Sequence, residues 1–137
     1  MIGCLNCVNS SVCLACGDGY AVDTVNLNCT LCNNTLTGCV LCNSTTICTS
    51  CSSIYYLSSN ACLSCQSISN CITCTSSTVC TSCNSDYYLD ATFKCTTCTT
   101  ISGCFTCLNS TACIGCVNGY YLNTTSLSCS RCSPNCA

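Results

Sequence analysis

The sequence predicts a small disulfide-rich repeat protein in which tandem short β-hairpin modules form an elongated rod, with essentially no α-helix. Cysteine supplies 25 of the 137 residues, about twice the roughly 8–10% that already indicates a disulfide scaffold. The cysteines recur at fixed spacing, and a short aromatic and aliphatic run follows the fourth cysteine of each set, as at the start of a strand. No apolar 3.6-residue period is long enough for a helix.

The composition also restricts the function. The net charge is −2 with only two basic residues, and there is no His or Trp. Two cations cannot follow a phosphate backbone, which excludes nucleic-acid binding. Because the usual general acids and bases are almost absent, we expect no enzymatic activity. Without cysteine, the apolar residues are too few for an ordinary core, so cysteine must replace the core.

The cysteines form a regular repeat. Four successive sets of six follow the pattern C-x2-C-x5-C-x2-C-x(10–12)-C-x2-C, and one further cysteine opens a fifth set. The sets begin 35, 32, 33 and 32 residues apart, at Cys4, Cys39, Cys71, Cys104 and Cys136. A period of this length is the signature of a repeat array. We divide the chain into repeats 1–35, 36–67, 68–100 and 101–133, and residues 134–137 begin a fifth.

Each repeat is predicted to hold a β-hairpin after its fourth cysteine. Aromatic and aliphatic residues are followed there by a polar turn and then by the fifth cysteine, which fits a strand, a turn and a return strand. These runs are residues 19–22, 55–57, 87–89 and 119–122. The x5 segment, between the second and third cysteines, is rich in Ser, Thr and Asn and is predicted to be a polar loop.

The hairpins suggest the first disulfides. A C-x-x-C pair rarely bonds to itself in a structural module, whereas the fourth and fifth cysteines lie at the ends of two strands that fold back together. Their Cα atoms can approach the roughly 4.4–6.8 Å that a disulfide requires. The predicted bonds are Cys16–Cys29, Cys51–Cys62, Cys83–Cys95 and Cys116–Cys129.

The four cysteines between successive hairpins are best paired first to third and second to fourth. This gives Cys32–Cys42, Cys39–Cys48, Cys65–Cys74, Cys71–Cys80, Cys98–Cys107 and Cys104–Cys113, with Cys4–Cys13 in the first repeat. Sequence does not prove connectivity, so this pairing is a hypothesis. It leaves Cys7, Cys132 and Cys136 without partners, at the places where a preceding and a following repeat should dock.

The alternative uses of the C-x-x-C pairs are zinc binding and redox chemistry. A four-thiolate zinc site would carry a charge of about −2 with almost no cation nearby. A redox thiol needs a helix N-terminus or a cation, and the sequence supplies neither regularly. We therefore predict structural disulfides, no metal and no cofactor, in a secreted protein that is extracellular or on the cell surface.

N-glycosylation sequons support that compartment. They occur at Asn9, Asn28, Asn33, Asn43, Asn109 and Asn123. With almost no charge to keep the chain soluble, we expect N-glycans there and O-glycans on the hydroxyl-rich runs.

Two other groups of residues have a structural and a functional interpretation. The seven Tyr could form a binding ladder, but we favour packing, with one of each pair over the disulfides and the other facing outward. The four Asp are scattered and form no calcium motif. Asp23 and Asp90 fit turn positions better.

Neither an apolar leader nor a membrane-spanning run is present. We therefore expect this chain to be a segment of a longer precursor or a link in a head-to-tail polymer. Its expected partners are other repeats or copies of itself.

The unit from Cys104 to Cys132, which contains Gly119-Tyr120-Tyr121-Leu122, resembles the furin-like and growth-factor-receptor cysteine-rich repeats. It resembles still more the tandem arrays of protist surface proteins, such as the variant surface proteins of Giardia and ciliate surface antigens. The resemblance covers almost the whole chain and implies the same alternating disulfide pairing. Ile54 and Asp86 depart from it, since they replace the glycine before Tyr. Such modules serve as receptors, coats, adhesins and spacers.

The sequence therefore predicts a non-enzymatic extracellular structural protein, a glycosylated disulfide-stapled repeat rod of a cell-surface coat or extracellular filament. The alternative is a ligand-binding receptor or adhesin ectodomain. A binding site should break the periodicity in one repeat with an exposed apolar or charged patch. The repeats stay alike, which favours the structural interpretation.

Overall fold

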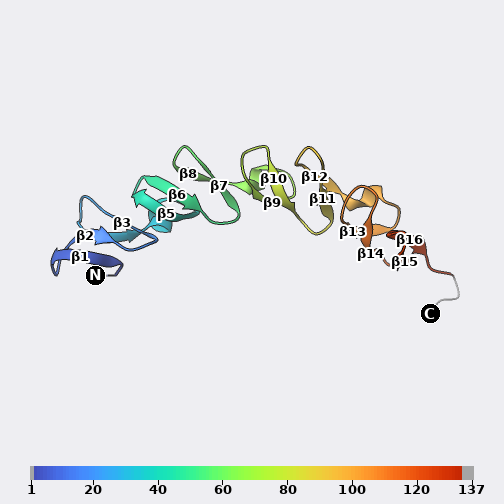
Figure 1. The fold of residues 1–137 in the computed structure, drawn as a ribbon, viewed down its shortest axis with the longest axis horizontal. Coiled ribbons are helices and arrows are strands. Elements are labelled where there is room, and N and C mark those ends of the chain that lie inside the picture. Colours follow the sequence, from blue (N-terminus) through green and yellow to red (C-terminus); the bar gives the residue numbers. More distant parts are fainter. Residues whose placement is uncertain (1, 134–137) are drawn as a thin grey trace. The chain divides into compact units, whose positions relative to one another are not determined.

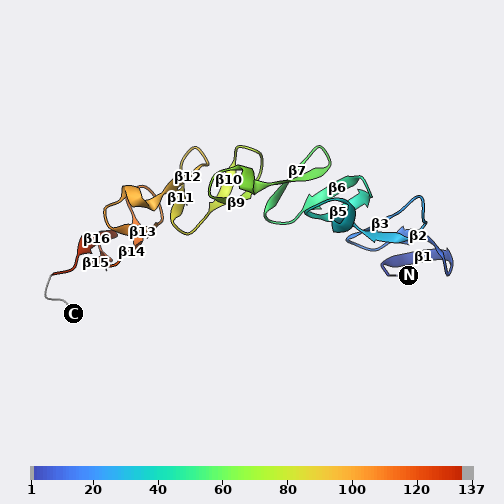
Figure 2. The same cartoon turned by 180° about the vertical axis from the view of Figure 1, so that it is seen from behind.

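A computed structural model describes residues 2–133 of the chain. The predicted start of a fifth repeat, residues 134–137, and its Cys136 lie outside the described residues. The chain divides into two compact units, one of residues 1–65 and 75–77 and the other of residues 66–74 and 78–137. Each unit is built of two-stranded antiparallel hairpins that follow one another along the chain (Figure 1 and Figure 2). The predicted fold class, a disulfide-rich series of short β-hairpins, is confirmed.

The first unit contains four hairpins. Their strands are β1 (Cys4–Asn9) with β2 (Val12–Cys16), β3 (Tyr20–Val22) with β4 (Cys29–Leu31), β5 (Cys39–Ser44) with β6 (Ile47–Cys51), and β7 (Tyr55–Ser58) with β8 (Ala61–Ser64). A single helical turn, α1 (Cys32–Thr35), connects the second hairpin to the third, and a 3-10 turn, η1 (Cys65–Ser67), follows β8.

The second unit repeats the scheme. Its strands are β9 (Cys71–Cys74) with β10 (Cys80–Cys83), β11 (Tyr87–Leu89) with β12 (Cys95–Thr97), β13 (Cys104–Cys107) with β14 (Cys113–Cys116), and β15 (Tyr120–Asn123) with β16 (Ser128–Arg131). A second 3-10 turn, η2 (Cys98–Thr100), connects its middle hairpins. The predicted hairpin after the fourth cysteine is thus present in every repeat, as β3–β4, β7–β8, β11–β12 and β15–β16.

Each repeat also has a hairpin that the sequence did not predict. This hairpin contains the first four cysteines of the repeat. The x5 segment provides its turn and, in the first two repeats, also the ends of its strands, so the expectation of a plain loop there was incomplete. In the first repeat Cys4 lies opposite Cys16 and Cys7 lies opposite Cys13. The Asn9 side chain accepts a hydrogen bond from the Ser11 backbone N–H (2.8 Å), which closes the turn. The C-x-x-C spacing fits this register because a bulge separates the two cysteine pairs.

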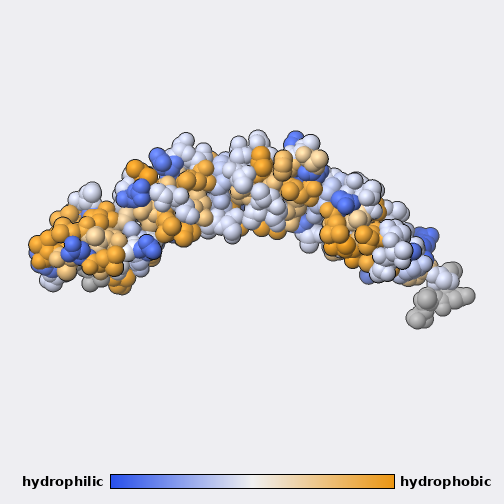
Figure 3. Space-filling model, viewed as in Figure 1, coloured by the Kyte–Doolittle hydropathy of each residue, from blue (hydrophilic) through white to orange (hydrophobic). Residues whose placement is uncertain are grey.

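The interior is made of cystine. Every buried apolar residue among those described is a cysteine except Ala21. In the second unit, Cys98, Cys104, Cys107 and Cys113 form one cluster, and partly buried side chains such as Tyr88 and Leu122 pack on it. Many large aliphatic side chains remain exposed in both units, and Figure 3 shows hydrophobic residues, coloured orange, on the surface of both units. Disulfides therefore occupy the place of the usual apolar core.

The turn of the second hairpin in each repeat contains a non-glycine residue in the left-handed region. These residues are Leu27 (φ 53°), Asn60 (φ 66°), Phe93 (φ 60°) and Leu127 (φ 49°). Their carbonyl oxygens accept a hydrogen bond from the N–H of the third cysteine of the repeat, as Cys13 donates to Leu27 at 2.7 Å. The strained residue thus connects the two hairpins of one repeat.

We expect Leu27→Asn to stabilise the protein. A left-handed conformation costs an ordinary L-residue about 1–2 kcal/mol, and Asn tolerates it better. Leu27 is 41% exposed, so little packing is lost. The free energy of unfolding should rise by about 0.5–1 kcal/mol, measured by guanidinium titration of the unglycosylated protein with its disulfides intact. A lower free energy would show that packing of Leu27 outweighs the backbone strain.

Candidate functional site

The disulfides are the chemically distinctive feature of the molecule. The first unit has the bonds Cys4–Cys13, Cys16–Cys29, Cys32–Cys42, Cys39–Cys48 and Cys51–Cys62. The second unit has the bonds Cys71–Cys80, Cys83–Cys95, Cys98–Cys107, Cys104–Cys113 and Cys116–Cys129. Each of these is a pair that the sequence predicted. Cys65 and Cys74 are also disulfide-bonded, and their pairing with each other stays a prediction.

Hairpin geometry explains this connectivity. In the hairpin β5–β6, Cys39 lies opposite Cys51 and Cys42 lies opposite Cys48. The bond within the hairpin is diagonal, from Cys39 to Cys48. The other two cysteines of the hairpin bond outside it: Cys42 to Cys32 of the preceding repeat, and Cys51 to the hairpin that follows. The hairpin β5–β6 therefore has one internal and two external bonds, and β13–β14 repeats this arrangement.

Two disulfides stack in every repeat. The Sγ atoms of Cys13 and Cys29, which belong to different bonds, are 3.3 Å apart. The equivalent distances in the following repeats are 3.3, 3.4 and 3.2 Å. The stacked bonds hold the two hairpins of a repeat together, since one bond lies within the first hairpin and the other joins it to the second.

The same stacking places sulfur atoms as close together as metal ligands would be. In the first repeat the Sγ atoms of Cys4, Cys13 and Cys29 lie within 4.8 Å of one another, and each later repeat has an equivalent group. Zinc binds thiolate sulfur. All three sulfurs are bonded to another sulfur in this structure, so these cysteines could serve as zinc ligands only after reduction.

In three of the four repeats, the first tyrosine of the second hairpin packs on a glycine, a contact that was not predicted from the sequence. A Cβ added to Gly38 would lie 2.7 Å from the ring of Tyr55, and Gly38 has a φ of 77°. Gly3 with Tyr20 and Gly103 with Tyr120 repeat this contact. The signal was present in the sequence: Gly or Asn immediately precedes the first cysteine of each repeat, at positions 3, 38, 70 and 103.

The other tyrosines follow the predicted division in part. Tyr121 is 55% exposed, while Tyr88 packs on the cystine cluster of the second unit. The predicted contact of tyrosine with the disulfides thus holds for Tyr88, whereas Tyr20, Tyr55 and Tyr120 contact the glycine immediately before the first hairpin of their repeat.

The asparagines of all six sequons are exposed; they are Asn9, Asn28, Asn33, Asn43, Asn109 and Asn123. The Oδ1 atom of Asn109 accepts hydrogen bonds from the N–H of Thr111 (2.9 Å) and from its hydroxyl (3.0 Å). The side chains of Asn9 and Asn123 close turns in a similar way. The sequons therefore lie where a glycan could be attached without displacing the cystine interior.

Asp90 organises a turn, as predicted. Its Oδ1 atom accepts hydrogen bonds from the Thr92 hydroxyl (2.7 Å), the Thr92 N–H (2.8 Å) and the Lys94 N–H (3.1 Å), while Oδ2 accepts one from the Thr96 hydroxyl (3.0 Å). The Thr92 hydroxyl, followed by the Lys94 N–H, lowers the pKa of Asp90 to about 2. The side chain of Asn26, which donates a hydrogen bond to Asp23, likewise lowers the pKa of Asp23.

These pKa shifts predict a loss of stability in acid. The folded pKa of Asp90 is below the value of about 3.9 for an unfolded Asp, so the carboxylate stabilises the fold above about pH 4 and this contribution disappears towards pH 2. The thermal midpoint of unfolding should therefore decrease from about pH 4 to about pH 2. The variant Asp90→Asn should show a smaller decrease. Asp18→Asn, which removes the same charge from an exposed position, should leave the decrease in place. Equal pH profiles for the two variants would contradict the role of Asp90.

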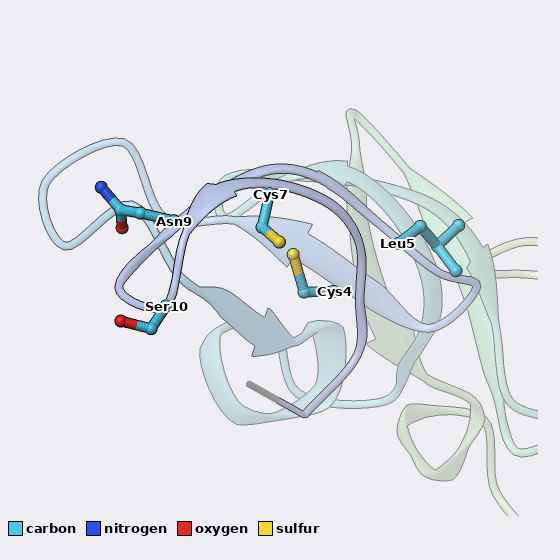
Figure 4. A pocket seen from close by; sticks show the side chains of 5 residues that line it. All are labelled: Cys4, Leu5, Cys7, Asn9 and Ser10. Atoms are coloured by element: carbon cyan, nitrogen blue, oxygen red, sulfur yellow. The ribbon is translucent and has the colours of Figure 1, made fainter.

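Two cysteines are free thiols among the described residues: Cys7 is exposed and Cys132 is half-buried. Both were predicted to lack partners. Cys7 lies in a surface cavity of about 250 Å³, lined by Cys4, Leu5, Cys7, Asn9 and Ser10. Figure 4 shows the sulfur of Cys7 pointing towards that of Cys4 beneath the turn.

The fold and its chemistry define a class, a disulfide-rich protein of tandem two-stranded hairpins. Comparison with family models, with curated proteins and with solved structures found no match to the chain. Within residues 2–133, no helix has the length and apolar composition needed to cross a bilayer.

Proposed function

We propose that the chain is a non-enzymatic extracellular structural protein, a glycosylated and disulfide-stapled repeat array of a cell-surface coat or extracellular filament. Such arrays would be of the furin-like type that occurs in protist surface proteins. The observation that carries the proposal is the cystine interior, in which Ala21 is the one buried apolar residue other than cysteine among those described. Disulfides of this density persist in oxidising compartments and are rare in the cytosol.

The distribution of exposed apolar side chains supports a structural role over a receptor. They recur at the position after the first cysteine of each repeat, as Leu5, Val40, Ile72 and Phe105, with exposures of 76%, 49%, 41% and 53%. A dedicated ligand site would concentrate them in one repeat. A periodic apolar position is better suited to contacts with other repeats or with copies of the same chain.

The proposal includes no metal and no cofactor. The covalent groups that we propose on the chain are N-glycans and O-glycans.

The exposed sequons support the proposal that the chain forms the outer surface of such a coat. Asn9, Asn43 and Asn109 lie at or beside the turn of the first hairpin in their repeats: Asn9 ends β1, Asn43 is the last but one residue of β5, and Asn109 lies between β13 and β14. Glycans attached there would provide the hydration that four Asp, one Lys and one Arg cannot provide for 137 residues.

Peptide mapping of the protein isolated from its source, without reduction and with and without glycosidase, tests the proposal. We expect the disulfides described above and glycans on Asn9, Asn43 and Asn109. Free thiols throughout, with zinc released on thiol blocking, would disprove the extracellular scaffold. Unmodified asparagines with intact disulfides would remove the glycan part alone. Saturable binding of one soluble ligand to a single repeat would favour the receptor or adhesin.

A further inference from the structure

We propose that Cys132 of one molecule forms a disulfide with Cys7 of a second copy, so that the chains join covalently head to tail. This inference deepens the proposed function and rests on it in one respect, since the bond needs an oxidising compartment. With this bond, the repeats of neighbouring chains would be connected by the same type of disulfide junction that connects the repeats within one chain.

Cys132 has the backbone position of the cysteines that form junctions inside the chain. Its N–H donates a hydrogen bond to the Gly119 carbonyl at 2.9 Å. At the equivalent places, the N–H of Cys32 donates to Gly19 and that of Cys98 donates to Asp86, both at 2.9 Å. Cys32 and Cys98 bond to the following repeats, at Cys42 and Cys107. The thiol of Cys132 is therefore held as one half of a junction.

Cys7 occupies the position of the partner cysteine in such a junction. It lies opposite Cys13 in the hairpin β1–β2. In the same register Cys42 lies opposite Cys48 and Cys107 lies opposite Cys113. Cys42 and Cys107 are bonded to the preceding repeat, whereas Cys7 is free.

The exposure of residues near Cys7 shows what a docked repeat would cover. Cys104 and Cys107 are 2% and 8% exposed where the preceding η2 turn packs against β13. Cys4, the equivalent of Cys104, is only half-buried and Cys7 is exposed. Leu5 is 76% exposed, against 53% for its equivalent Phe105.

A surface cavity lies beside the free thiol of Cys7. It has a volume of about 250 Å³ and is lined by Cys4 and Leu5 as well as by the free thiol itself. Figure 4 shows the side chains of Cys4 and Cys7 facing each other in this hollow. The segment of a second copy that carries Cys132 would enter there, as α1 precedes β5 and η2 precedes β13 within the chain. The occupant we infer is thus a second copy rather than a small ligand.

The bond requires an oxidant, and a small-molecule disulfide such as oxidised glutathione supplies it. The Cys132 thiolate attacks one sulfur of the oxidant and releases one small thiolate, leaving a mixed disulfide. The Cys7 thiolate of the second copy then attacks the Cys132 sulfur and releases the second small thiolate. Two protein thiols are oxidised, one small disulfide is reduced to two thiols, and their protons balance.

The test uses two variants with one reactive thiol each. Both carry Cys136→Ser, so that the cysteine outside the described residues cannot take part; one also carries Cys7→Ser and the other Cys132→Ser. Each is refolded, mixed with oxidised and reduced glutathione, and separated on a non-reducing gel. We expect each variant alone to remain largely monomeric and the equal mixture to give at least tenfold more dimer. The parent with Cys136→Ser should form a ladder of oligomers.

Mass spectrometry of the dimer should identify a peptide in which Cys7 is bonded to Cys132. Leu5→Asp, which places a charge in the cavity, should slow dimer formation several-fold, while Leu57→Asp, at an exposed strand position outside the cavity, should not. Equal dimer yields from the mixture and from the single variants would overturn the inference, as would a parent that forms only a monomer with an internal Cys7–Cys132 bond.

The outcomes separate this inference from the proposed function. If the other disulfides form in the refolded protein and the mixture yields no dimer, the junction between copies is wrong and the scaffold is unaffected. If the protein from its source contains free thiols throughout, the extracellular scaffold is wrong whatever the purified variants do.

Discussion

Reduction of the disulfides is expected to unfold the chain completely. A disulfide that closes a short loop contributes about 2–4 kcal/mol, and the bonds described here close loops of 9 to 13 residues. A domain of this size is stable by only about 5–15 kcal/mol in total. Because buried residues other than cysteine are almost absent, nothing else in the described part of the chain replaces the lost constraints.

The amide dispersion in a proton NMR spectrum measures this effect. It should collapse when a phosphine reductant is added at neutral pH, and the control is the same sample kept at the same temperature without reductant. Adding zinc to the reduced chain provides the opposing test. Recovery of a dispersed spectrum with zinc would show that the stacked cysteines, such as Cys4, Cys13 and Cys29, fold the chain as metal ligands as well.

Gly38→Ala is expected to be among the most damaging single substitutions outside the cysteines. Two effects add: the positive φ of 77° costs an Ala about 1–2 kcal/mol, and the new Cβ would lie 2.7 Å from the Tyr55 ring, an overpacking that costs about 1–3 kcal/mol. We expect the free energy of unfolding to fall by about 2–5 kcal/mol in total. Guanidinium titration of the oxidised protein measures it.

Gly119→Ala is the matched control. Gly119 has a φ of 86° and no heavy atom within 4 Å of an added Cβ, so it isolates the backbone cost of about 1–2 kcal/mol. The difference between the two variants is then the contact with Tyr55. Equal losses would mean that the tyrosine ring moves aside without cost.

The sequence predicted the hairpin after the fourth cysteine and most of the bonds because both depend on local spacing. Residues such as Tyr55 and Leu57 mark a strand, and a fixed number of residues returns the chain to the next cysteine. The hairpin β5–β6 was missed because its turn, formed by Thr45 and Thr46, is as polar as an ordinary loop and its strands have no regular alternation. A bulge between the cysteine pairs interrupts the pattern.

The candidate site was only partly predictable. That Cys7 and Cys132 lack partners follows from counting. The junction that we propose between them could not be predicted in this way, because it depends on the hydrogen bond from Cys132 to Gly119 and on the cavity beside Cys7. The contact of Gly38 with Tyr55 joins positions 17 residues apart in different hairpins, which no local pattern shows. The helical turn α1 has no side-chain cap, and its first residue, Cys32, forms a disulfide with Cys42.

The cystine interior separates the residues that specify the fold from those that define the surface. In an ordinary domain a change on one face of an element must be compatible with the volume of the packed face beneath it. Here the covalent bonds specify the hairpins, and a side chain such as Leu63 or Phe105 has few packed neighbours to accommodate. Such a chain can change most of its outer residues by mutation while its cysteines stay in place. The fold is therefore suited to evolving many different surfaces on one unchanged backbone.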